Sequence, residues 1–282
     1  MSERFELSID DPSYPEPLRD LPDPPKRLYG IGDPALLIPG LAVIGSRKAT
    51  PYGLRCADIF AGWAASKGIV IVSGAAMGCD QKAHQAALEA EGPTIAILGC
   101  GADVDYPKRG SRILADIRSV GLVLSEAPWG SPPQRFRFSR RNRLIAALSA
   151  AVLVVEASLP SGTFGTAKVA EEIGRTLLAV PGSIFAPECR GTNRLLSEGA
   201  CPVSDVSELA GAIGVLELRS ESAPPASSSD DTLARALIAD PMRPDDVARA
   251  LNMDIVDVAR HLGRLEREGI VAKYADGRYG PC

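Results

Sequence analysis

Histidine is scarce in this sequence, and the cysteines are scattered. Only His84 and His261 occur in 282 residues, and the six cysteines include no C-x-x-C pair. Structural zinc sites are built from clustered cysteine and histidine, and a Ser-His-Asp triad needs a positioned histidine. The sequence therefore supplies few residues for either kind of site. We therefore expect no metal and no other cofactor. Four cysteines within or beside apolar stretches are expected to be small buried hydrophobic residues in a reducing compartment: Cys56, Cys79, Cys100 and Cys201.

Long apolar runs are missing as well. No stretch approaches the roughly 18 consecutive apolar residues that a membrane-spanning helix needs. The N-terminus is acidic and proline-rich and lacks the basic and apolar regions of a signal peptide. These absences predict a cytoplasmic protein. The formal net charge of −4 argues against indiscriminate coating of nucleic acid, so any such binding has to be local.

Two common nucleotide-binding motifs are also absent. After the first apolar run, residues 41–44, the sequence reads GSRKAT instead of the dinucleotide-binding pattern G-x-G-x-x-G. The chain contains no Walker A loop of the form G-x-x-x-x-G-K-[ST]. Both absences count against an ordinary NAD-dependent enzyme or an ATPase.

What is present is a regular alternation of short apolar runs and helix-like stretches. Hydrophobic residues make up 45% of the chain, enough for a sizeable core. Continuous apolar strands with helical crossovers predict an α/β fold, a doubly wound, Rossmann-like parallel sheet covered on both faces. Strands are expected at residues 41–44, 69–72, 94–98, 122–125, 151–156 and 176–180, and helices at 52–66, 80–91, 111–120, 141–148 and 165–174.

Composition divides the chain into four parts. Residues 1–40 form a proline-rich N-terminal extension, of which residues 11–34 are expected to lie extended over the Rossmann-like domain at residues 41–216. Residues 217–229, ELRSESAPPASSS, have the composition of a linker. Residues 230–282 predict a small winged-helix domain, with helices at 231–238, 243–251 and 255–268 and strands at 270–274 and 278–279. The third helix carries nearly balanced charges, so a protein-contact or vestigial role competes with DNA binding there.

Nearly every predicted strand ends in a loop of small residues. In open α/β sheets the ligand sits beyond the carboxyl ends of the strands, so these loops should converge on one crevice. Glycine permits close backbone approach, and amides at helix N-termini favour phosphate. Turns between strands and helices need glycine in any case. Five such loops at the same edge of the sheet, with Arg47 projecting from the first, nevertheless indicate an anionic ligand. The loops are 45–47, 73–75, 99–101, 161–163 and 181–183.

The segment 135–149, RFRFSRRNRLIAALS, packs five arginines around Phe136 and Phe138 and then turns apolar. Arginine offers a planar cationic fork to phosphate, and phenylalanine offers a face on which an unpaired base stacks. Most charge runs are simply solvated. Because the chain as a whole is acidic, we favour a local nucleic-acid surface here, with Phe136 or Phe138 stacking a base.

Taken together, the motifs resemble the DNA-processing protein A (DprA/Smf) family. The matching segments are YPEPLRDLPDPPKRLYGIGD, AVIGSRKATPYG, IVSGAAMGCDQKAH, LGCGADVDYP, FSRRNRLIAALS, VVEASLPSGTFGTAKVAEEIGRTLLAVPG and GTNRLLSEGA. The resemblance implies a protein that is not an enzyme, binds single-stranded DNA taken up during natural transformation, protects that strand and loads the RecA recombinase onto it. It also implies a homodimer.

Carried over by motif, the resemblance places DNA contacts on the loops and the basic segment, to which the charge pattern adds Arg137 and Arg140. Asn193, Leu195 and Leu196 are similar to the family's dimer region, with the leucines exposed on one helix face; packing under the sheet is the alternative. Met77 stands where the family commonly has arginine, and Ser139 replaces the proline of the signature F-P-x-R-N-R. The expected DNA contacts are Gly45, Ser46, Arg47, Ser73, Gly74, Gly78, Gly101, Arg137, Phe138, Arg140, Arg141, Asn142, Arg143, Ser161, Gly162, Thr166 and Lys168.

Two other functions compete with this reading. Rossmann-like relatives that cleave nucleoside monophosphates carry a loop P-G-G-x-G-T-x-x-E. Here the stretch 160–166 has one extra residue, and Glu171 follows five residues after the threonine instead of three, which argues against that chemistry.

Asp80 and His84, four residues apart, suit an acid–base pair, although we favour a helix cap with a hydrogen bond along the helix face. A transcription regulator acting through the winged helix is the least favoured, given the nearly neutral third helix.

Overall fold

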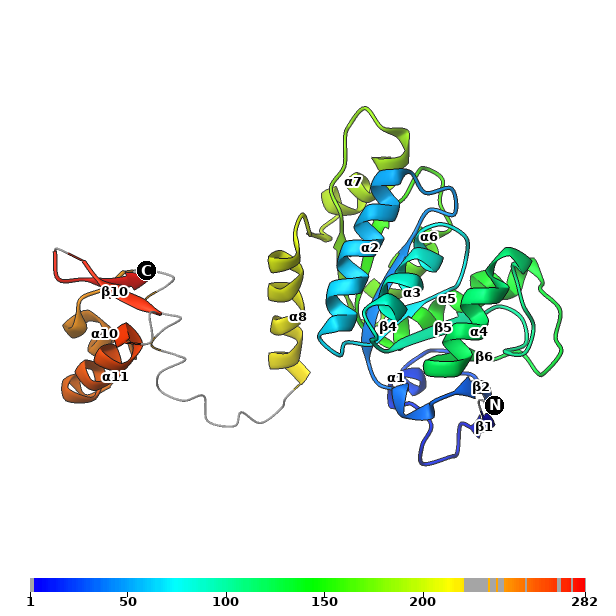
Figure 1. Cartoon of the computed structure of the whole chain (residues 1–282), viewed down its shortest axis with the longest axis horizontal. Coiled ribbons are helices and arrows are strands. Elements are labelled where there is room, and N and C mark those ends of the chain that lie inside the picture. Colours follow the sequence, from blue (N-terminus) through cyan, green and yellow to red (C-terminus); the bar gives the residue numbers. More distant parts are fainter. Residues whose placement is uncertain are drawn as a thin grey trace. The chain divides into compact units, whose positions relative to one another are not determined.

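The computed structural model describes residues 3–220 and, toward the C-terminus, residues 233, 237, 241–251, 253–267, 270–274 and 276–281. The chain divides into two compact units, Met1–Leu218 and Arg219–Cys282 (Figure 1). Within the described residues, no helix combines the length and the apolar character needed to cross a membrane.

The first unit is built on one nine-stranded sheet, with the order β1-β2-β6-β5-β4-β3-β7-β8-β9. The strands from β6 to β9 in this order are mutually parallel, whereas β1 and β2 are antiparallel additions. The doubly wound parallel sheet predicted from the sequence is thereby confirmed. The strands are β1 (Arg4–Ser8), β2 (Arg27–Gly32), β3 (Gly40–Gly45), β4 (Ile71–Ser73), β5 (Thr94–Leu98), β6 (Leu122–Ser125), β7 (Ser149–Glu156), β8 (Thr176–Ala179) and β9 (Cys201–Pro202).

Helices cover both faces of this sheet because the buried strands are apolar on both sides. Leu41 and Val43 of β3 belong to the core cluster under α2, α3 and α8. Their neighbours Ala42 and Ile44 face the other way, into the cluster formed with α1, α5, α6 and α7. The helices are α1 (Glu16–Arg19), α2 (Pro51–Ser66), α3 (Cys79–Glu89), α4 (Ser111–Val120), α5 (Arg135–Ala147), α6 (Thr163–Glu172), α7 (Arg190–Ser197) and α8 (Val206–Ser220).

Part of the N-terminal segment joins the sheet, whereas the sequence predicted that the segment would lie extended over the domain. Strand β2 pairs with β6 on one side and β1 on the other. The prolines cluster at residues 12–25 and resume at Pro34, so the intervening stretch Arg27–Gly32 can donate every ladder hydrogen bond. Between the two strands, Tyr14, Leu18 and Leu21 are buried in the main core.

Three smaller expectations also need correction. Helix α5 begins at Arg135, six residues before the expected start, because arginine is a good helix former and its charged side chains find room on the partly exposed first turns. Helix α8 continues to Ser220, into the expected linker, whose residues 221–229 lie outside the described part. Cys201 is exposed, since it lies on the two-residue edge strand β9.

The second unit has its own small core. Helices α10 (Pro244–Leu251) and α11 (Ile255–Arg267) precede an antiparallel pair, β10 (Val271–Lys273) and β11 (Tyr279–Pro281). The buried side chains of Val247, Val258 and Leu262 pack together with those of Leu233 and Leu237, the two described residues of the expected first helix. Two helices and a hairpin fit a winged helix, and that assignment remains a prediction.

Candidate nucleic-acid interface

A cavity of about 560 Å³ opens at the carboxyl edge of the sheet. It lies where the strand order reverses, because β4 follows on one side of β3 and β7 on the other. Ligands of open α/β proteins bind at this kind of switch point. Four cations, Arg47, Lys48, Arg135 and Arg141, line the cavity against one carboxylate, that of Asp80.

The loop after β3 is shaped by its contact with the loop after β4. A Cβ atom at Gly78, where φ is +86°, would lie 2.2 Å from the carbonyl oxygen of Ser46, so only glycine fits. Likewise, a Cβ at Gly45 would lie 2.6 Å from the sulfur of Cys79. The Ser46 carbonyl accepts a hydrogen bond from the Cys79 amide at 3.2 Å. This packing leaves Arg47 on the outer side of the turn, exposed to solvent.

Arg141 has a different place from the one expected. Its side chain is buried, and its guanidinium donates hydrogen bonds to the carbonyl oxygens of Gly74, at 2.8 Å, and of Ile97. A Cβ at residue 74 would lie 2.5 Å from the guanidinium, so Gly74 makes room for it. Burial lowers the pKa of Arg141 to about 10, an effect that the negative charge of Asp80 opposes. Arg141 therefore ties the loop after β4 to strand β5 and lines the cavity as a buried side chain.

Asp80 and His84 do not form an acid–base pair. The carboxylate of Asp80 accepts a hydrogen bond from the Ala76 amide at 3.4 Å, and burial raises its pKa while Arg141 lowers it. Fully buried His84 places Nδ1 2.7 Å from the hydroxyl of Thr94, which itself donates to the carbonyl of Ile71. Nδ1 is therefore the protonated nitrogen, and burial lowers the pKa of His84 to about 3. The expected helix cap is wrong as well, because the N-cap of α3 is Gly78 and no side chain caps this helix. Among the described residues, no hydrogen bond along the helix face joins Asp80 to His84.

Glu156 is a buried residue that the sequence analysis missed. It ends β7, and its carboxylate accepts hydrogen bonds from the amide of Thr50, at 3.1 Å, and from the Thr50 hydroxyl. Thr50 is the N-cap of α2, so a carboxylate already occupies the positive end of that helix. Helix α6 differs, because its first turn lies at the cavity wall and contains no acidic residue. The sequence signal for Glu156 was an acidic residue closing an apolar strand.

The cavity brings together nine of the expected DNA contacts and leaves the others elsewhere. The nine are Gly45, Ser46, Arg47, Phe138, Arg141, Asn142, Ser161, Gly162 and Thr166. Lys48 and Arg135 also line it, although the sequence analysis did not select them. Their signals were adjacency to Arg47 and membership of the basic segment.

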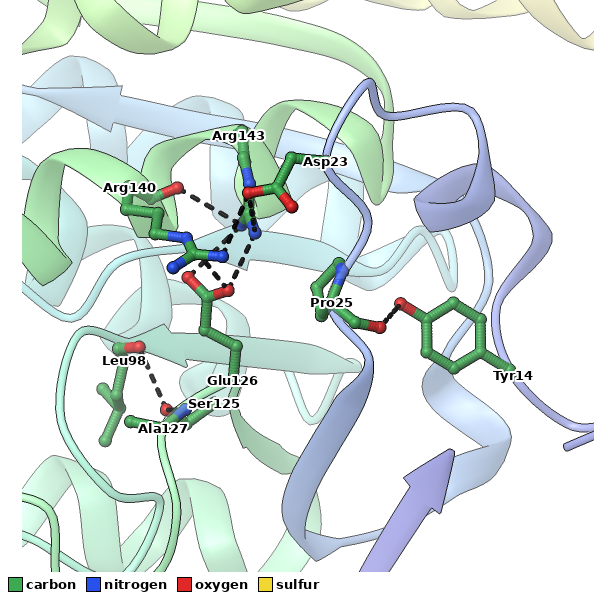
Figure 2. A network of polar contacts seen from close by, with 9 residues as sticks. All are labelled: Tyr14, Asp23, Pro25, Leu98, Ser125, Glu126, Ala127, Arg140 and Arg143. Carbon is green, nitrogen blue, oxygen red and sulfur yellow. Dashed lines mark hydrogen bonds and ion pairs between the residues drawn. The ribbon is translucent and has the colours of Figure 1, made fainter. Parts of the chain in front are cut away.

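The remaining expected contacts have other surroundings. Ser73 is buried and donates to the carbonyl of Val43 at 2.7 Å, and Gly101 packs against Asp103 and Gly130. Lys168 is exposed and pairs with Glu172 at 3.6 Å. The arginines of the other side of α5 face Asp23 and Glu126; Arg140 and Arg143 both pair with these carboxylates (Figure 2).

The expected dimer residues are engaged within the chain. Leu195 is buried in the main core and Leu196 is half-buried against it, so the alternative of packing against the sheet describes them better than exposure does. The side chain of Asn193 bonds to both the amide and the carbonyl of Gly182, at 3.0 and 2.9 Å.

A Rossmann-like sheet with a cation-lined cavity at its switch point is the kind of arrangement in which open α/β proteins bind phosphate-bearing ligands. Within the described residues, no group of three or more histidine, cysteine or acidic side chains is arranged to hold a metal ion. Sequence comparison then specifies the family. The chain belongs to the DNA recombination-mediator protein A family, whose sequence model matches residues 6–214.

Relatives and solved structures agree with this membership. Protein Smf of Escherichia coli is 40% identical over 205 residues, covering 72% of this chain and 55% of that protein. DNA processing protein DprA of Streptococcus pneumoniae is 42% identical over 196 residues, 69% of each chain. The matched region spans about half the length of the first curated relatives, such as Protein Smf of Synechocystis (54%).

Two solved structures share the fold. The X-ray structure of S. pneumoniae DprA has a TM-score of 0.71 and 39% identity, covering 74% of each chain. DNA processing protein A of Helicobacter pylori, studied for its single-stranded DNA binding mode, has a TM-score of 0.68 and 33% identity, covering 76% of this chain and 98% of that one.

Proposed function

We propose that this protein binds single-stranded DNA at the cavity between the carboxyl ends of β3 and β7. The observation that carries the proposal is the excess of cations there, four against one carboxylate, in a chain whose formal net charge is −4. Such a concentration of positive charge attracts a polyanion locally without making the whole surface basic.

The geometry supports distinct roles for the lining residues. Arg47, Lys48 and Arg135 are exposed and form no ion pair with any described residue, so their charges are available to phosphates. The first turn of α6 offers a helix N-terminus without a competing carboxylate. Phe138 lines the cavity with its ring held beside Tyr106, the centroids 5.3 Å apart, and offers a surface for an unpaired base.

The proposed action is binding, not catalysis. A nucleoside-monophosphate-cleaving enzyme needs a carboxylate close to its substrate, yet Glu171 is exposed and is not among the residues that line the cavity. Asp80, which does line it, is committed to the Ala76 amide and faces Arg141.

Family membership supports the finer biological role. We propose that the protein acts in the cytoplasm, protects single strands taken up during natural transformation and loads RecA onto them as a homodimer. Ile184 and Phe185, 75% and 88% exposed just before α7, give a second copy an apolar surface beside the region expected to form the dimer. Residues 230–282 are proposed as a winged helix. RecA filament formation on strands coated with single-strand-binding protein, with and without this protein, tests the loading step.

The binding proposal is tested by fluorescence anisotropy with labelled oligothymidylate over a salt series. Wild type should prefer single strand to duplex and weaken steeply as salt rises. Arg47→Ala should lower affinity about tenfold. It should also lower the slope of affinity against salt concentration by about the amount that one phosphate contact contributes. Arg55→Ala, which removes an exposed arginine paired with Asp58 on α2 away from the cavity lining, should bind as wild type does. If the wild-type protein did not bind the strand but bound or cleaved a mononucleotide, the result would favour a nucleoside-monophosphate-cleaving enzyme instead.

A further inference from the structure

A second cavity, of about 400 Å³, lies on the other side of the first turns of α5. This volume falls within the range of small-ligand pockets, roughly 300–1,000 Å³. Its walls come from the N-terminal segment at residues 23–27, the ends of β5 and β6, and α5. Figure 2 shows the polar network on one of these walls, with Arg140, Arg143 and Glu126 close together and Asp23 approaching from the N-terminal segment.

The two cavities lie back to back across α5. Arg135, Phe138 and Asn142 line the first cavity, whereas Phe136, Arg137 and Arg140 line the second, as the spacing of a helix requires. The partition between them is thin. A Cβ at Gly99, which lines the second cavity, would lie 2.8 Å from the ring of Phe138, which lines the first.

The second cavity also carries an excess of positive charge. Four cations line it, Lys26, Arg27, Arg137 and Arg140, against the carboxylates of Asp23 and Glu126. Those two carboxylates are occupied. Arg140 bonds to Asp23 at 3.0 Å and lies 3.5 Å from Glu126, which also holds Arg143 at 2.8 Å. The hydroxyl of Tyr14 donates to the carbonyl of Pro25 at 2.8 Å and so holds the segment in place (Figure 2).

This arrangement leaves two cations and an aromatic ring available. Among the described residues, neither Lys26 nor Arg137 forms an ion pair, and one terminal nitrogen of Arg137 is buried without a hydrogen-bond acceptor. The side chain of Phe136 is 60% exposed, with the guanidinium of Arg137 5.8 Å from its ring centroid. A cation without an ion-pair partner beside an exposed aromatic ring suits a phosphate followed by an unpaired base.

We propose that the second cavity is a further nucleotide subsite for the same DNA strand, which crosses the first turns of α5 from one cavity to the other. Arg137 and Lys26 hold a phosphate there, and Phe136 stacks the adjoining base. The N-terminal segment therefore forms part of the DNA-binding surface. This inference rests on the proposed binding of single-stranded DNA in the first cavity.

Affinity as a function of strand length tests the inference. Oligothymidylates that lengthen one nucleotide at a time should bind wild type in two stages, as first one cavity and then both are filled. Phe136→Ala and the double variant Lys26→Gln/Arg137→Gln should match wild type on the shortest strands that bind. Each should lose about tenfold in affinity on longer ones, since stacking of one base contributes about 1–3 kcal/mol. Lys67→Gln, at the C-terminal end of α2, is the matched control and should change nothing.

A position-specific readout separates a direct contact from a structural effect. A strand carrying 2-aminopurine at successive positions should show quenching at one position that disappears in Phe136→Ala. Equal loss of affinity at every length, or no loss at any length, would overturn the second subsite while leaving the first intact. Failure of wild type to bind strands of any length would instead overturn the proposed function itself. Circular dichroism melting curves check that the variants are folded.

Discussion

The polar residues that surround the first cavity and those in the protein interior below it form two layers with opposite behaviour. The lower layer, which we call the floor, consists of Asp80, His84, Arg141 and Glu156, all buried. The upper layer, the rim, consists of Arg47, Lys48, Arg135 and Asn142. Floor side chains are engaged with the protein itself, as when Arg141 donates to two backbone carbonyls. No rim cation forms an ion pair with another described residue.

The difference between the two layers separates two roles, stabilising the site and attracting phosphate, that neighbouring residues of one sequence motif can have. Arg141 and Asn142 are neighbours in one motif and both line the cavity, yet Arg141 is buried and holds the loop after β4 against β5, whereas Asn142 is only partly buried. A buried cation engaged with carbonyls contributes to stability and to the shape of the site, whereas an exposed cation contributes to the attraction of phosphate. Floor variants should therefore change the free energy of unfolding, and rim variants should change affinity alone.

The largest effect is expected for Arg141→Met. The change leaves the buried carboxylate of Asp80 without its nearby cation and two carbonyls without a donor, so the free energy of unfolding should fall by about 3 kcal/mol. Urea denaturation measures this loss. Arg140→Met, with an exposed side chain on the same helix, should cost less than about 1 kcal/mol.

Gly74→Ala sharpens the same test, because its added Cβ would collide with the Arg141 guanidinium. Gly74→Ala alone should lower the free energy of unfolding by about 1–3 kcal/mol. In a protein that already carries Arg141→Met, the same substitution should lower it by clearly less. If Arg141→Met lost DNA binding at unchanged stability, Arg141 would belong to the rim and the division into two layers would fail.

Much of the fold could be predicted from the sequence because its signals are local. Continuous apolar runs located the parallel strands, and β5 and β6 have the predicted limits. The first turns of α5 were missed because a run of arginines has no apolar periodicity until Leu144 is reached. Strand β2 was missed because neighbouring prolines obscured a stretch that is itself free of proline.

The site was less predictable for a physical reason. That loops after parallel strands converge follows from topology, so Ser46, Ser161 and Gly162 were correctly expected to lie together. Whether an arginine is buried depends on distant acceptors. The carbonyls that hold Arg141 belong to residues 67 and 44 positions away in the chain. No spacing within the motif carries that information.

The next effect concerns His84 in the floor and depends on pH. Burial lowers the pKa of His84 from 6.5 to about 3 in the folded protein, so below pH 6.5 the unfolded chain binds a proton that the folded one does not. The contribution of His84 to the free energy of unfolding is therefore fully present above pH 6.5. It is lost as the pH falls toward 3, by about 1.4 kcal/mol per pH unit. Urea denaturation between neutral pH and pH 5 should show this dependence in wild type. His84→Gln should show a correspondingly shallower dependence; identical pH dependences would place the histidine outside the floor.

A smaller effect, on binding only, is expected for the rim residue Arg135. Arg135→Gln removes one exposed cation from the cavity lining and should weaken oligothymidylate binding about fivefold at low salt, as expected for one phosphate contact. Its unfolding curve should superimpose on that of wild type. Arg112→Gln, an exposed arginine on α4, provides the control because α4 lies outside both cavities. A loss of stability in Arg135→Gln without a loss of affinity would move this residue to the floor.

The smallest effect is expected for Lys168, and it marks where the rim ends. Its side chain is 77% exposed on α6 and pairs with Glu172 one turn later, away from the residues that line either cavity. Exposed pairs of this kind contribute about 0.3–0.5 kcal/mol, so Lys168→Ala should leave stability nearly unchanged and alter affinity less than twofold. The same anisotropy titration measures it beside Arg135→Gln. A tenfold loss would mean that the strand continues onto the outer surface of α6, because an exposed charge outside the cavity affects affinity this strongly only when phosphate passes beside it.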